Sequence, residues 1–258
     1  MNKNINRRRY FSLFKINFIY FLFILIFLIS FFVLYSQNKK IDFFLNKTIE
    51  DLSKNFKYQF LNLEINGLIN VKKKFIENKT KKYLESSIFL LPLDEITNHF
   101  KENNWVKNVD LKTNYKDTLY VKIDEYIPLG IYTFNGRKFF FDNKGKIIDE
   151  IDNQNISLNK FFIFEGQSSN LNAQKIINIL DELNIQFKSQ IKKFVFIENR
   201  RWNIILKKNI RLLLSENFPK KSIENYLKIE KKLSEIEMNN IESIDLRNLK
   251  KTIIKYKE

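Results

Sequence analysis

Residues 105–128 of the chain read WVKNVDLKTNYKDTLYVKIDEYIP, and this stretch decides the fold of the region around it. Val109, Leu111 and Thr113 share one parity while polar residues hold the other, which is typical of a half-buried strand. A second alternating run extends from Leu119 to Ile123. Because the polar residues 114–117 separate the two runs, the pattern predicts an antiparallel β-hairpin.

The sequence before the hairpin predicts one strand and two helices. Residues 60–65 alternate as a strand does and stop at the turn signal Asn66-Gly67. Residues 71–84 have apolar positions spaced for one helical face, and a second helix starts near Pro92 with Leu93, Ile96 and Phe100 on one side. Residues 58–127 are therefore expected to form a β-α-α-β-β domain.

The remainder, residues 128–258, is expected to be a mainly antiparallel β domain with two helices, which makes the fold class α+β. The expected strands are 131–134, 138–141, 146–148, 191–197, 202–206, 210–214, 241–246 and 252–256, and the expected helices cover about 173–187 and 219–236. Trp105 and Trp202 each begin an apolar strand, so both are expected to pack in a core.

The N-terminal region predicts one transmembrane helix. Residues 16–38 carry no charge, and a run of this length reaches about the 30 Å of a bilayer core. The basic tail 1–15 contains no acid, whereas 39–57 mixes both signs, so the positive-inside rule places the N-terminus in the cytoplasm. A cleaved signal peptide is the less favoured alternative, because the run is too long and Tyr35-Ser36-Gln37 does not fit a cleavage site. Residues 39–57 are polar without a strong period and are expected to form a membrane-proximal linker, in part helical.

The composition argues against an enzyme. The chain has no cysteine and a single histidine, His99, which is expected to be structural or solvated. A histidine-based relay or a common zinc site is hard to build from this inventory, and the sequence has no glycine-rich phosphate loop. We therefore expect no catalytic, cofactor-binding or metal-binding residue and no small-molecule substrate. The net charge of +16 comes from lysines scattered along every segment, so nucleic-acid binding is not predicted.

The motifs between residues 58 and 247 resemble those of the FtsQ/DivIB family of bacterial cell-division proteins, whose first extracytoplasmic domain is a POTRA domain. The resemblance rests on Trp105-Val106 after the second helix, Asp117-Thr118-Leu119 in the hairpin, Glu125 with Pro128 at the junction, Asp142 to Gly145 in a turn, the Trp-led segment 202–213, and Asp245-Leu246-Arg247. Their order and spacing carry more weight than any one of them. The resemblance implies a bitopic inner-membrane scaffold of the divisome at midcell, with its C-terminal domains in the periplasm.

The last strand is the candidate site. Ile253 and Ile254 lie between Lys250-Lys251 and Lys255, so an edge strand here would offer free peptide groups beside basic side chains. Such charges often only deter unwanted pairing. The resemblance instead favours β-augmentation by an FtsB/FtsL-type partner, with other divisome membrane proteins docking on the POTRA-like domain. The candidate partner-binding residues are Arg247, Lys250, Lys251, Ile253, Ile254, Lys255 and Tyr256.

Two other functions stay open on the sequence alone. A POTRA-bearing chaperone or translocation component for exported proteins is the first alternative. A periplasmic hydrolase tethered by its anchor is the second, and an activity screen on peptidoglycan would reveal it.

Overall fold

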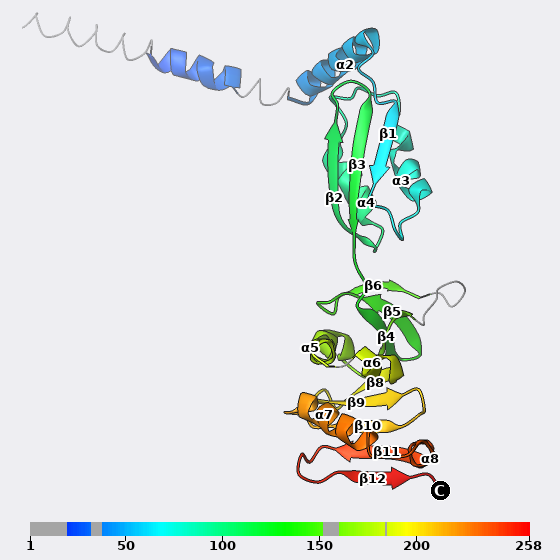
Figure 1. The fold of residues 1–258 in the computed structure, drawn as a ribbon. Helices are drawn as coiled ribbons and strands as arrows, with labels where there is room; N and C mark the ends of the chain where they lie inside the picture. The colour runs from blue at the N-terminus through cyan, green and yellow to red at the C-terminus, as the bar shows by residue number, and fades with distance from the viewer. Residues whose placement is uncertain (1–19, 32–37, 152–159, 184) are drawn as a thin grey trace, which may run out of the picture. The chain divides into compact units, whose positions relative to one another are not determined.

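The computed structural model describes residues 20–31, 38–151, 160–183 and 185–258, which form two compact units (Figure 1). Unit 1 contains the described residues up to Ile65 together with Lys74–Thr97 and Asp110–Val121. Unit 2 contains Asn66–Lys73, Asn98–Val109 and Lys122–Glu258. The boundaries expected at 57/58 and 127/128 stay predictions.

Part of the predicted transmembrane segment is described. Residues 20–31 are helical, and their apolar side chains are exposed. The rest of the segment, 16–19 and 32–37, and the basic tail 1–15 lie outside the described residues. Within the described ranges, no helix combines the length and the apolar character needed to cross a membrane.

The linker expected over 39–57 is a continuous helix, α2 (Asn38–Phe56). Its C-terminal half is attached to the rest of unit 1 by hydrogen bonds. The hydroxyl oxygens of Ser53 and Ser87 lie 2.6 Å apart, and the backbone N–H of Ser87 donates to Glu50 Oε2 at 3.0 Å. Both serines are buried, so this end of α2 has a fixed seat in the unit.

The strand-helix-helix-strand-strand order expected for 58–127 is confirmed. The strands β1 (Asn62–Asn66), β2 (Val106–Thr113) and β3 (Thr118–Glu125) form a sheet with the order β1-β3-β2. The intervening helices are α3 (Lys73–Thr80), the 3-10 helix η1 (Lys81–Tyr83) and α4 (Leu93–Lys101). On β3, Leu119, Val121 and Ile123 are buried and alternate with exposed neighbours, as the sequence pattern predicts.

The C-terminal region contains a nine-stranded sheet in the order β12-β11-β10-β9-β8-β7-β4-β5-β6. Five of its neighbouring pairs are antiparallel, and β4–β7, β7–β8 and β10–β11 are parallel, so the prediction of a mainly antiparallel sheet is confirmed. The strands are β4 (Gly130–Phe134), β5 (Arg137–Phe141), β6 (Ile147–Glu150), β7 (Ile163–Glu165), β8 (Ile191–Ile197), β9 (Arg201–Leu206), β10 (Arg211–Leu214), β11 (Ile241–Leu246) and β12 (Ile253–Tyr256).

The prediction of two helices after residue 128 is wrong, because the described part of this region has four. These are α5 (Ser169–Asp181), α6 (Ile185–Gln190), α7 (Pro219–Glu230) and α8 (Glu235–Asn240). The helix expected over 219–236 ends early, and a new one starts after Ser234, where a capping box forms with Glu237. Ser234 Oγ accepts from the Glu237 N–H, and the Ser234 N–H donates to the Glu237 carboxylate at 2.8 Å.

The core of the nine-stranded sheet is aromatic at its centre. Phe164 and Phe194 stack with ring centroids 4.9 Å apart, and Trp202 meets both rings edge-on. Trp202 is buried, and Trp105 is partly buried against a smaller cluster that includes Phe140. The expectation that both tryptophans pack in a core is therefore confirmed. Ile223 and Tyr226 of α7 are fully buried, and α7 contacts β10 and β11.

Candidate partner-binding edge

β12 is the outermost strand at one end of the nine-stranded sheet (Figure 1). It pairs antiparallel with β11, and no other described strand lies on its second side. The prediction that residues 252–256 form an edge strand is therefore confirmed. The peptide groups on the second side of such a strand are available to another chain.

The register identifies which peptide groups face outward. Ile244 pairs with Ile254 and Asp245 with Ile253, and a bulge in β11 lies between Ile241 and Ser243. Beyond the strand, the N–H of Lys257 donates to the carbonyl of Asn240 at 2.8 Å. Because backbone groups alternate in direction along a strand, those of Ile254 and Tyr256 point away from β11.

The side chains of β12 have different surroundings. Ile254 packs against the main core and so anchors β12 to the domain. Ile253 and Tyr256 are 54% and 50% exposed. The edge thus combines outward peptide groups with two half-exposed apolar side chains, which is the combination that strand addition uses.

Two of the candidate cations are already paired within the chain. Lys255 Nζ lies 2.5 Å from Glu242 Oε2 across the β11–β12 ladder. Arg247 forms a two-pronged contact with Asp245, from Nε to Oδ1 at 2.9 Å and from Nη2 to Oδ2 at 2.6 Å. These hydrogen bonds lower the pKa of Glu242 and of Asp245. An acidic partner would have to compete with these intramolecular acids.

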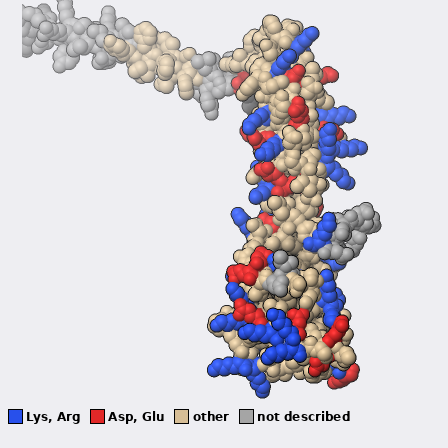
Figure 2. Space-filling view, in the orientation of Figure 1, with Lys and Arg blue, Asp and Glu red and all other residues tan. Residues whose placement is uncertain are grey.

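Lys250 and Lys251 lie in the turn before β12 rather than on the strand. The Lys250 N–H donates to Asn248 Oδ1 at 2.9 Å, and the Lys251 N–H donates to the Asn248 carbonyl. Both lysine side chains are exposed, and neither forms an ion pair with another described residue. Figure 2 shows Lys and Arg side chains gathered, with Asp and Glu among them, over the end of the molecule that carries the nine-stranded sheet. Among the described residues of the site, the turn thus carries the lysines that form no ion pair within the chain.

A shallow, open depression of about 570 Å³ lies beside this turn. Its lining joins the end of β10 and the start of α7 to the β11–β12 turn, and consists of Ser215, Asn217, Phe218, Arg247, Asn248 and Leu249. Phe218 is 51% exposed. Sequence reasoning missed Phe218 and Glu242, because only the strand register and the fold bring them beside the candidate residues. Asp245 stands two positions before Arg247, so its contact with Arg247 had a local signal in the sequence.

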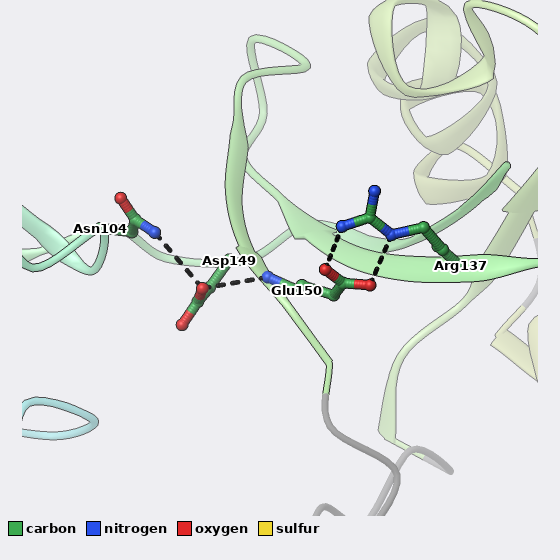
Figure 3. Close-up of polar contacts among 4 residues, drawn as sticks. All are labelled: Asn104, Arg137, Asp149 and Glu150. Carbon is green, nitrogen blue, oxygen red and sulfur yellow. Dashed lines mark hydrogen bonds and ion pairs between the residues drawn. The ribbon is translucent and has the colours of Figure 1, made fainter.

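The opposite edge of the sheet, β6, is engaged by side chains of unit 2. Asp149 accepts hydrogen bonds from Asn104 Nδ2 at 3.4 Å and from Trp105 Nε1 at 3.1 Å. Arg137 forms a two-pronged contact with Glu150 on the neighbouring strand (Figure 3). The two edges therefore differ: contacts from other segments of unit 2 reach β6, whereas the outer side of β12 faces no described strand.

The described residues contain no group of three or more histidine, cysteine or acidic side chains that could hold a metal ion. His99, on α4, lies 2.9 Å from Glu102 through Nδ1. That contact joins neighbouring turns of the same segment. The candidate site consists of outward main-chain groups, two half-exposed apolar side chains and charged side chains.

Two family models match successive parts of the chain. Residues 60–126 match the model described as POTRA domain, FtsQ-type, and residues 131–247 match the model described as cell division protein FtsQ/DivIB, C-terminal. Together they cover the chain from the first strand to Arg247 apart from a short junction. The second match stops before β12, so the edge strand itself lies outside the matched range.

Relatives with established names agree with these matches. Cell division protein FtsQ of Rickettsia bellii is 28% identical over 200 residues, which cover 76% of this chain and 72% of that protein. The FtsQ proteins of Rickettsia prowazekii and Bartonella bacilliformis are 27% and 25% identical, over 76% and 62% of this chain and 72% and 51% of their own lengths. Both domain matches and the similarity to these proteins lead to one conclusion: the chain belongs to the FtsQ/DivIB family of cell division proteins.

Proposed function

We propose that this chain is a non-enzymatic, single-pass scaffold of the division machinery, anchored in the inner membrane by residues 16–38. Its N-terminus lies in the cytoplasm and residues 58–258 lie in the periplasm. The chain links cytoplasmic and periplasmic division proteins at midcell. Its POTRA-type domain docks other membrane proteins of the divisome, and β12 binds a strand of an FtsB/FtsL-type partner.

The anchor is supported by the uncharged run 16–38 and the acid-free basic tail before it. Protease added to intact spheroplasts should digest residues 58–258 of the full-length chain. Complete protection of that part would contradict the proposed orientation.

The observation that carries the partner site is the outward direction of the peptide groups of Ile254 and Tyr256 on an edge strand. Each added main-chain hydrogen bond contributes about 0.5–1.5 kcal/mol, so a short docked strand gains several such increments. Ile253 and Tyr256 add apolar contacts, and Lys250 and Lys251 favour an acidic residue at one end of the partner strand. The site therefore fits a short, extended, partly acidic segment.

The test compares two substitutions at one position. Tyr256→Ala and Tyr256→Pro both remove the phenol ring, but only proline removes the outward N–H and places its own ring in the path of an added strand. Full-length variants are solubilised from membranes, and the recovery of the partner is compared with that of the unchanged chain. We expect Tyr256→Ala to keep much of the recovery and Tyr256→Pro to lose most of it.

Equal recovery with both variants would refute strand addition at β12. A truncation that removes 249–258 provides a second arm, because recovery of the partner with this shortened chain would also refute the site. Thermal unfolding of each variant shows whether the remaining sheet is intact. Since β12 is terminal in the sheet, its removal takes a neighbour from β11 alone, and β11 remains paired with β10.

The cellular role has its own measurement. A fluorescent fusion to the N-terminus of the full-length chain should concentrate at midcell in dividing cells. A uniform envelope signal would contradict the role in division.

A further inference from the structure

Helix α2 carries an exposed apolar stripe along its length. Ile41, Leu45, Leu52 and Phe56 are 40%, 51%, 50% and 69% exposed. A helix turns about 100° per residue, so these four side chains lie within about one sixth of its circumference. Phe44, 67% exposed, borders the same stripe. Side chains of this size are rarely left in water as a contiguous stripe unless something covers them.

The described residues of unit 1 leave this stripe exposed. α2 is seated through Glu50 and Ser53, which bond to Ser87. On the helical wheel both residues point away from the stripe, Ser53 by about a quarter turn and Glu50 by nearly half a turn. Lys47 and Lys54 are exposed and project from the side opposite the stripe, where the exposed Phe43 also lies. The helix is therefore seated on unit 1 by residues that point away from its open apolar stripe.

We propose that the apolar stripe of α2 lies in the headgroup region of the membrane that residues 16–38 span, with the helix axis along the membrane surface. This inference rests on the proposed anchor. The chain emerges from the anchor at residue 38, where α2 begins, so the first turns of α2 are held at the interface. An amphipathic helix with phenylalanine and leucine on one face and lysine on the other is the kind that binds in that plane.

The contacts between α2 and the rest of unit 1 then fix the orientation of unit 1 relative to the bilayer. The Ser53–Ser87 and Glu50–Ser87 contacts join the buried end of the helix to the rest of the unit. A helix standing upright would place only its first turn near lipid. A helix lying flat places Leu52 and Phe56 there as well, about 16 and 23 Å along its axis from residue 41 at about 1.5 Å per residue.

The chain suits a label-based test because it contains no cysteine. Three single-cysteine variants of the full-length chain, Leu25→Cys, Phe43→Cys and Leu52→Cys, are labelled with a solvent-sensitive fluorophore. The proteins are reconstituted in vesicles of phosphatidylethanolamine and phosphatidylglycerol, with and without lipids that carry a spin-label quencher. Leu52 and Phe43 are nine positions apart, so they project from opposite sides of the helix. Both are half or more exposed, at 50% and 72%, which makes Phe43 a matched control.

We expect a several-fold greater loss of fluorescence from lipid quenchers at position 52 than at position 43, together with a blue-shifted emission at 52. Strong quenching at 25 combined with none at 52 would overturn the flat orientation while leaving the anchor intact. No quenching at 25 would instead overturn the anchor and this inference with it. Shielding at 52 that requires a second membrane protein in the vesicle would also overturn the inference, because the cover would then be protein.

Discussion

Trp105 Nε1 donates a hydrogen bond to Asp149 Oδ2 at 3.1 Å, and the indole ring packs against Phe140 with centroids 5.4 Å apart. Asn104, the residue before Trp105, reaches the other carboxylate oxygen at 3.4 Å (Figure 3). The Trp-Val motif thus does two things in unit 2. The indole ring packs in a small aromatic cluster, and the indole N–H donates a hydrogen bond to the carboxylate of Asp149 on the edge strand β6.

Trp105→Phe tests the hydrogen bond apart from the ring. Phenylalanine retains the contact with Phe140 but has no donor for Asp149, so we expect a loss of about 1 kcal/mol in the free energy of unfolding. A double-mutant cycle with Asp149→Ala, which removes the acceptor, isolates the pair when measured by urea denaturation. A coupling energy of about 1 kcal/mol is expected. Strictly additive effects would contradict the assignment of this contact.

Glu125 should make the stability of the protein depend on pH. Its carboxylate accepts the backbone N–H groups of Ile69 and Val71 at 2.8 and 2.9 Å, and of Asn70 at 2.8 Å. Partial burial raises the pKa of Glu125, but these donors outweigh it and hold the pKa below the ordinary value of 4.5. A pKa lowered by folding gives stability that is complete above the unfolded-state pKa and is lost as the pH falls through the folded-state pKa.

Glu125→Gln is therefore expected to lower the free energy of unfolding by about 1–3 kcal/mol at neutral pH, since a neutral amide accepts from fewer donors. The gap between the variant and the unchanged chain should narrow as the pH falls through the lowered pKa of the folded Glu125 carboxyl. Urea denaturation at neutral pH and at an acidic pH gives the two differences. Glu64→Gln, at an exposed position on β1, serves as the control and should show little change at either pH.

Gly166 is required by a close approach of two strands' ends. Its φ is +99°, and a Cβ there would collide with the carbonyl oxygen of Phe196 at the end of β8. Gly136 has a φ of +77° but no atom within 4 Å of its Cβ position. We expect Gly136→Ala to cost about 1 kcal/mol from backbone strain alone and Gly166→Ala to cost clearly more. Equal shifts in the thermal unfolding midpoint would show that the approach to Phe196 is relaxed.

Ser222 connects α7 to two strands of the large sheet. Its hydroxyl accepts from the Ser215 N–H at 3.0 Å and donates to the Leu246 carbonyl at 2.9 Å, and the residue is fully buried. Ser222→Ala leaves both groups without this partner, so a loss of about 1–3 kcal/mol in unfolding free energy is expected. Ser189→Ala, which removes an exposed hydroxyl that bonds to the Gln186 carbonyl, is the control and should have a small effect.

Local patterns predicted the strands of the hairpin 105–128 and the final strand well, because each has an alternating face that a single burial direction explains. The sequence also held an unused signal at Ser234, where serine followed three residues later by Glu237 marks a helix start. Helix α2 is harder to predict, because the large apolar residue Phe43 lies opposite the apolar stripe and weakens the helical period. β7 has three residues, and its two parallel neighbours are distant in the sequence, so no local pattern could reveal its pairing.

The sequence indicated which residues form the candidate site, but not how their charged side chains are arranged. Charge spacing indicated Lys250, Lys251 and Lys255 as a group, yet the fold separates them. Lys255 faces Glu242 across the ladder, whereas the two others lie in the turn. This distinction depends on a register that includes a bulge in β11, which the alternation of residues 241–246 does not disclose.

Under the proposed strand addition, the outward peptide groups of Ile254 and Tyr256 have a consequence for how the chain and a partner would diverge. A strand that is bound mainly through its backbone amide and carbonyl groups retains affinity for the bound strand when most of its side chains are replaced, provided that its length and extended shape persist. The side chains of the turn that carries Lys250 and Lys251, rather than those of β12, would then determine which partner is bound in each species. Exchanging that turn between distant relatives should change which partner is bound, while the outward peptide groups of β12 serve the same purpose in each relative.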